Sequence, residues 1–188
     1  DSACTLVLVE TAEEDRSLDL IRREAANRDL PVWTWSTARA LTRDGGEPQY
    51  GTDTVHQALA AIGSLPGPGV FVIADGHDAL ADQIVVRKVK ELTATFDETR
   101  TLVMTAPVHV TPPELASIAH VWRLRPPDAD ELDSLVERTL ASLESRGFEI
   151  RLDDGGRARI VTSLRGLSLA QAQHLLHRVT VRDGIFHY

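Results

Sequence analysis

The chain lacks the features that several classes of protein require. It has a single cysteine, Cys4, which excludes a disulfide framework and fits a reducing compartment. No apolar run approaches the roughly 20 residues that span a bilayer, and no secretory signal pattern is recognisable. Lys and Arg number 20 against 28 Asp and Glu, so at a net charge of −8 no broad basic face is available for phosphates. We therefore expect a cytoplasmic protein that binds neither membrane nor nucleic acid.

The turn after the first apolar strand also lacks the residues that bind a triphosphate. The strand Thr5-Leu-Val-Leu-Val9 is followed by Glu10-Thr-Ala-Glu-Glu-Asp-Arg16. A phosphate loop needs glycines, whose backbone N–H groups close around the anion, and a lysine that meets its charge. This turn has neither and adds four carboxylates. Because no Gly-x-Ser-x-Gly elbow, Cys–His signature or Rossmann glycine pattern is present either, the sequence predicts no catalytic residue.

The first two thirds of the chain predict an α/β fold. Near-continuous apolar runs of strand length alternate with segments whose apolar residues recur at helical spacing; the runs are 5–9, 32–35, 70–74, 101–105 and 120–124. This alternation predicts a five-stranded, mostly parallel sheet sandwiched by helices. Functional residues are then expected where the strands end.

The pattern changes after Arg125. Pro126 and Pro127 end the sheet region, and Asp128 with Glu131 forms a capping-box pattern before a long amphipathic stretch. Ser168 and Gln171 form a second capping-box pattern. The sequence thus predicts a core at 1–127 and a small helical lid at 128–188.

These features resemble a known family, the AAA+ ATPases, in which an α/β core is followed by a helical lid. The likeness is closest to the amino-terminal, degenerate domain of AAA+ proteins first catalogued as open reading frames of algal plastid genomes and also found in bacteria. It covers essentially the whole chain and rests on Pro31-Val-Trp-Thr-Trp-Ser36, Val70-Phe-Val-Ile-Ala-Asp75, Pro112-Pro-Glu-Leu115 and Leu164-Arg-Gly-Leu-Ser-Leu-Ala-Gln-Ala172.

The resemblance implies positions for a degenerate site. Asp75 matches the Mg²⁺-associated carboxylate of a Walker B strand, but Gly76 stands where an active ATPase usually has the glutamate that orients water. Thr105 matches one sensor position, and Arg165 lies in the region of a second. The resemblance also implies an intact downstream ATPase domain as partner, which would hold ATP and Mg²⁺, and a homo-oligomeric parent protein. No cofactor and no metal are expected for this chain.

Other residues have both a structural and a functional interpretation. Glu13, Glu14 and Asp15 suit the positive end of a helix dipole, and Arg16 suits pairing with one of them, but the group could also form an interface. Trp35 is expected in the core unless it shapes a surface for a neighbour. Arg87 and Lys88 are expected on a solvated helix face or in an anion- or subunit-contacting patch.

A receiver domain is the alternative. Glu10, Asp75 and Thr105 end strands where a phosphate-accepting receiver has functional residues, with Asp75 as the phosphoacceptor. Against this alternative, Arg125 replaces a lysine and the first strand ends without an acidic pair.

Overall fold

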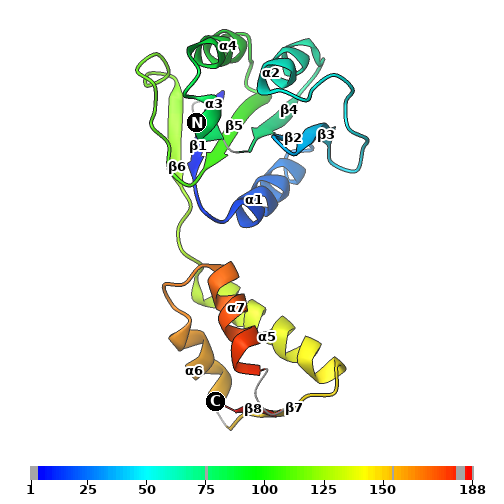
Figure 1. Cartoon of the computed structure of the whole chain (residues 1–188), viewed down its shortest axis with the longest axis vertical. Helices are drawn as coiled ribbons and strands as arrows, with labels where there is room; N and C mark the ends of the chain where they lie inside the picture. The colour runs from blue at the N-terminus through cyan, green and yellow to red at the C-terminus, as the bar shows by residue number, and fades with distance from the viewer. Residues whose placement is uncertain (1–3, 75, 154, 181–184, 188) are drawn as a thin grey trace. The chain divides into compact units, whose positions relative to one another are not determined.

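The computed structural model describes residues 4–74, 76–153, 155–180 and 185–187. The chain divides into two compact units, Asp1–Leu124 and Arg125–Tyr188 (Figure 1).

The first unit is built on a six-stranded sheet. Its strands are β1 (Leu6–Glu10), β2 (Val32–Ser36), β3 (Arg39–Arg43), β4 (Gly69–Ile73), β5 (Arg100–Ala106) and β6 (Ala119–Arg123). The order across the sheet is β3-β2-β4-β5-β1-β6, and only β3 runs antiparallel to its neighbour. The helices are α1 (Glu14–Ala26), α2 (Val55–Ser64), α3 (Gly76–Ala79) and α4 (Gln83–Ala94).

The two faces of the sheet have different side chains. On one face, rows such as Leu6, Leu102 and Phe71 pack in register beneath the apolar residues of α2 and α4. On the other, a row of valines that includes Val72 and Val103 packs against α1. The helix α1 covers this face of the sheet (Figure 1). Successive side chains of a strand point to opposite faces of the sheet. The apolar side chains on both faces are buried here, as expected for a parallel sheet.

The structure confirms the five predicted strands and adds a sixth. The strand β3 forms a hairpin with β2 at the edge of the sheet, and Leu41 is its only fully buried residue. A single buried residue between exposed arginines produces no alternating or continuous apolar pattern, which explains why the sequence did not predict it.

The strand order contradicts the receiver alternative. Among the parallel strands the order is second, third, fourth, first, fifth, because β1 lies between β5 and β6. The receiver type of doubly wound sheet has its first strand between the second and third. The order in which the strands pair therefore excludes the receiver fold. The residues at the strand ends do not make this distinction.

The second unit is mainly helical. It contains α5 (Ala129–Ser145), α6 (Gly156–Ser163), α7 (Leu169–Thr180) and a two-stranded sheet of β7 (Glu149–Arg151) and β8 (Ile185–His187). Both predicted capping boxes are present, at Asp128 with Glu131 and at Ser168 with Gln171. Leu132, Val136, Ile160 and other apolar side chains of the three helices form one separate core. The unit thus has its own apolar interior.

Arg100 fixes the end of α2 to the sheet, which leads to a stability prediction. Its guanidinium donates to the carbonyls of Ile62 at 2.7 Å and Leu65 at 2.8 Å and lies 4.7 Å from the ring centre of Phe96. Arg100→Ala is expected to lower the free energy of unfolding by about 2 kcal/mol, because two charge-assisted hydrogen bonds to the helix end are lost. Urea denaturation measures the change. Arg28→Ala, which removes an exposed pair with Glu24, should cost less than about 0.5 kcal/mol; equal losses would contradict the assignment.

Candidate functional site

The candidate site lies at the ends of the parallel strands, where β1 leads into α1. In parallel α/β sheets this edge is the usual place for a ligand. The eight residues from Glu10 to Ser17 occupy the turn and the first turn of α1. Their count equals that of a Gly-x-x-x-x-Gly-Lys-Ser/Thr phosphate loop, and Arg16 and Ser17 fall at its last two positions.

In this turn the cation is neutralised by the turn's own carboxylate. Arg16 Nη1 donates to Glu13 Oε2 at 3.1 Å, and the two side chains are only 8% and 13% exposed. A lysine at this place in a phosphate loop meets the β- and γ-phosphates. Here the largely buried side chain of Glu13 takes the role of the anion.

The hydroxyl at the next position is also occupied. Ser17 is fully buried, and its Oγ donates to the carbonyl oxygen of Glu14 at 2.7 Å. The backbone N–H of Glu13 donates to Thr11 Oγ1 at 2.8 Å, which shows that the turn uses its own side chains to satisfy its backbone. In a phosphate loop the Ser or Thr hydroxyl binds Mg²⁺ and the backbone N–H groups face the phosphates.

Sequence reasoning predicted the pairing of Arg16 with an acidic neighbour but missed its position. The signal was available: counting eight residues from the end of the first strand places an Arg-Ser pair where Lys-Ser or Lys-Thr stands in a phosphate loop. The missing glycines hide this register, because a phosphate loop is recognised first by its glycines.

Gly76 has no room for a side chain. A Cβ there would lie 2.9 Å from Met104 Cβ and 3.5 Å from Cε1 of the His109 ring. His109 is buried, and its Nε2 lies 3.0 Å from the carbonyl oxygen of Met104. The position at which resemblance expects a glutamate is thus closed by neighbouring side chains, so more than a point substitution separates it from an active site.

Glu10 joins β1 to two neighbouring segments. Arg123 Nε on β6 donates to Glu10 Oε2 at 2.5 Å, and the backbone N–H of His109 donates to Glu10 Oε1 at 3.4 Å. The hydrogen bond from Arg123 holds the pKa of Glu10 below its usual value; the bond from His109 adds to this, while desolvation opposes it. Ionised Glu10 therefore links the end of β1 to β6 and to the segment that follows β5.

The other residues predicted for the site differ in burial and in the unit to which they belong. Asp75 lies outside the described residues. Thr105 is buried, by strand alternation on the α1 face, and its Oγ1 has no hydrogen-bond partner within the described part of the chain. Arg165 is an exposed residue of the second unit, in the turn between α6 and α7. Asp15 is exposed at the start of α1, and Glu14 is half-buried beside it.

Of the predicted interface residues, the structure buries Trp35 as well as Arg16. Trp35 is 4% exposed and its indole Nε1 donates to the carbonyl oxygen of Thr52 at 2.7 Å, so its ring belongs to the core and offers no surface to a neighbour. Arg87 is exposed and pairs with Glu91 at 2.6 Å, one helical turn away. Lys88 is half-buried.

Within the described ranges, no three His, Cys, Asp or Glu side chains group closely enough to hold a metal ion. No described helix is both long enough and apolar enough to cross a membrane.

An α/β unit of this topology, with a separate helical unit after it, has the architecture of an AAA+ ATPase module. Residues 1–124 match the family model described as "SpoVK-like AAA ATPase, N-terminal domain", and residues 130–187 match "SpoVK-like AAA ATPase, second domain". The chain therefore belongs to the SpoVK-like AAA ATPase family. No curated protein matches it.

Solved structures agree on the fold. The FIGL-1 AAA domain in complex with ADP superposes with a TM-score of 0.61 at 17% identity, covering 94% of this chain and 60% of that one. RuvB of Thermotoga maritima, a Holliday junction branch migration motor, gives a TM-score of 0.61 at 16% identity, with 98% and 58% covered. This chain thus spans about three fifths of the length of either structure, and at these identities the likeness shows the fold alone.

The tie between Glu10 and Arg123 should make stability depend on pH. Since the pKa of Glu10 is lowered in the folded state, its contribution is present above the unfolded-state pKa and is lost as the pH falls through the lowered pKa. Arg123→Ala removes the main cause. We expect the variant to unfold more easily than the wild type at neutral pH, with the difference shrinking below the unfolded-state pKa and lost once the pH falls below the lowered pKa of folded Glu10. Urea denaturation across this range tests it, and a difference that persists at acid pH would contradict the ionised tie.

The closed position at Gly76 gives a second prediction. Gly76→Ala should lower the free energy of unfolding by about 1–3 kcal/mol, because the new Cβ overlaps Met104. The matched control is Gly63→Ala in α2, where a Cβ would meet only Leu92 Cδ1 at 3.4 Å. Since alanine favours a helix interior, that control should be neutral or stabilising by up to about 1 kcal/mol. Thermal and urea denaturation of both variants would show the opposite signs.

Proposed function

We propose that this chain is a non-hydrolysing AAA+-like module of a larger ATPase, which serves assembly, regulation or partner binding. The largely buried pair of Arg16 with Glu13 is the observation on which the proposal depends. A triphosphate at this turn would have to displace a carboxylate that already neutralises the cation, and would meet three further carboxylates in the same turn. Like charges held together are strongly disfavoured, so binding energy is lost before any contact forms.

The surroundings of Gly76 support the absence of hydrolysis. An active site of this class uses a side chain to orient the attacking water. At Gly76 the space for such a side chain is taken by Met104 and His109. The chain would therefore need no cofactor of its own, and ATP and Mg²⁺ would bind to a downstream domain of the same protein.

A module without turnover can still influence a neighbouring motor. A domain that packs against another changes its conformational equilibrium by whatever difference in contact energy it has with the two states. We propose the downstream ATPase domain of the same protein, and other copies of the protein, as the partners of this chain, and a kinship with the plastid-reading-frame type of AAA+ protein. Nucleic acid and membrane are not proposed as partners.

Nucleotide binding tests the proposal directly. The chain is titrated with a fluorescent ATP analogue and by calorimetry with Mg-ATP, and phosphate release is measured. We expect no saturable binding up to about 1 mM nucleotide, a limit that corresponds to about −4 kcal/mol, and no turnover. Saturable, Mg²⁺-dependent binding would overturn the proposal.

Substitution of Arg16 distinguishes a structural cation from a nucleotide-binding one. Arg16→Ala leaves a buried carboxylate without this partner and should cost about 3 kcal/mol of unfolding free energy. The double variant Glu13→Gln with Arg16→Gln should lose less than the sum of the two single changes. A variant as stable as the wild type but altered in nucleotide affinity would instead indicate a working phosphate site.

A further inference from the structure

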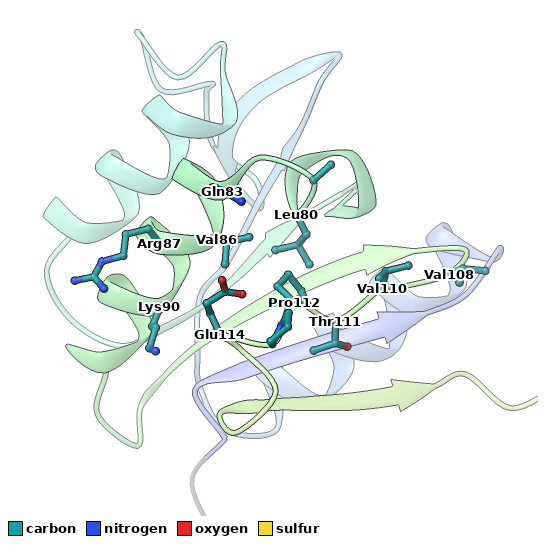
Figure 2. A pocket seen from close by; sticks show the side chains of 12 residues that line it. Leu80, Gln83, Val86, Arg87, Lys90, Val108, Val110, Thr111, Pro112 and Glu114 are labelled. Atoms are coloured by element: carbon teal, nitrogen blue, oxygen red, sulfur yellow. The ribbon is translucent and has the colours of Figure 1, made fainter.

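A groove opens beside α4, on the first unit. It has a volume of about 770 Å³ and lies between α4 and the segment that joins β5 to β6 (Figure 2). Leu80 and Val86 are nearly buried at its base, and Pro112 lies opposite them. Val108 and Val110, on the joining segment, are 66% and 85% exposed. Apolar side chains as exposed as these are unfavourable in water unless something covers them.

The rim of the groove is cationic. Arg87 and Lys90 line it from α4, at one end of the view in Figure 2, and Lys88 lies between them in the sequence. Neither Lys88 nor Lys90 forms an ion pair with the described residues, whereas Arg87 pairs with Glu91. Among the described residues, Glu114 is the only acidic one that lines the groove. The groove therefore suits an apolar or aromatic group accompanied by negative charge.

The same unit presents such a group on its opposite edge. Tyr50 is 102% exposed at the tip of the loop between β3 and α2. Glu47 and Asp53, which are also exposed, flank it at three residues on either side, and neither forms an ion pair with described residues. A fully exposed tyrosine between two carboxylates matches the groove in both apolar character and sign of charge.

The loop holds Tyr50 in a defined position. The backbone N–H of Gln49 donates to Leu41 O at 2.7 Å, and Thr52 Oγ1 donates to Gln49 O at 2.7 Å. Thr52 is buried, and its carbonyl oxygen accepts from the indole of Trp35. Gly51, at φ 73°, completes the turn beside the tyrosine. Since Gln49 before the tip and Thr52 after it are anchored, binding through Tyr50 costs little loop ordering, which favours a rigid aromatic anchor.

We propose that Tyr50 of one copy of the chain inserts into the α4 groove of a second copy, with Glu47 and Asp53 meeting Arg87 and Lys90. The loop follows the edge strand β3, and the groove lies beside the connection to β6 at the other edge of the sheet. Five inter-strand spacings of about 4.8 Å separate β3 from β6, so the loop cannot reach its own groove. The contact is head-to-tail, and repeated contacts of this kind close into rings or extend as filaments.

This inference rests on the proposed function and specifies its assembly surface. It also reassigns the basic group of α4: Lys90 and Arg87 face the groove, and Lys88 contributes to the local charge. It uses no nucleotide contact.

Sedimentation and light scattering of the purified chain test the contact. The wild-type mass should rise with concentration. Tyr50→Ser should weaken self-association by about tenfold or more, as expected for an aromatic anchor. The double change Val110→Asp with Lys90→Glu should weaken it similarly, because it places negative charge in the groove. All three positions are exposed, so the variants should keep the wild-type melting temperature.

Mixing the variants provides the decisive measurement. The Tyr50→Ser chain retains an intact groove, and the groove variant retains an intact tyrosine. Each alone should remain monomeric, and together they should form a one-to-one complex that grows no further. A contact in which each chain needs both features would not recover in the mixture, and neither would a surface meant for an unrelated protein.

Matched controls separate this contact from general changes of surface. Ile84→Ser removes an apolar side chain that is 63% exposed on α4 but does not line the groove, and Arg23→Glu reverses an exposed charge on α1. Both should leave self-association unchanged. A wild-type chain that stays monomeric up to about 1 mM, or a Tyr50→Ser chain that associates normally, would overturn the inference. Either result would leave the nucleotide titration, and thus the proposed absence of hydrolysis, unaffected.

Discussion

The largely buried ion pair between Arg16 and Glu13 is the constraint on which the interpretation of this molecule depends. Both side chains are withdrawn from water at the start of α1, at the edge of the sheet where a parallel α/β fold usually receives its ligand. A cation at such a place needs an anion, because burying an unpaired charge is very unfavourable. In a working phosphate loop the nucleotide supplies that anion. Here Glu13 supplies the anion, so the charge of Arg16 is neutralised without a ligand.

Other polar groups at the strand ends also have partners within the protein. Ser17 donates to a backbone carbonyl, and Glu10 is held ionised by Arg123. Met104 and His109 fill the space next to Gly76. Each of these groups has a protein partner where an active nucleotidase would use a phosphate, a metal ion or a water molecule. The architecture of an AAA+ module is thus retained while the polar groups of its site stabilise the fold.

Under the proposed function, the chain acts through its surfaces. The exposed side chains of the first unit include one fully exposed tyrosine in an acidic loop and a cationic apolar groove at the far edge of the same sheet. A parallel sheet with helices on both faces holds its two edges at a constant separation, so features at the edges can join copies in one direction. The central strands provide the rigidity that such a contact needs.

The sequence by itself determined the α/β class, the five parallel strands and the helical second unit. Burial of both faces of a strand and of one side of a helix leaves a periodic apolar pattern along the chain, and capping boxes such as Asp128 with Glu131 are local in sequence. It also showed that glycines and lysine are missing after the first strand. The sequence did not predict the edge strand β3, because only Leu41 is buried in it.

The tertiary structure alone decided the order of the strands, which excluded a receiver, and the burial of Trp35, which removed it from the surface. It also decided that Gly76 is closed by Met104 and His109, and that Tyr50 is exposed while Gln49 and Thr52 are anchored. These properties depend on contacts between residues far apart in the chain. No local pattern records them, because strand pairing and side-chain packing are set by which segments meet in space.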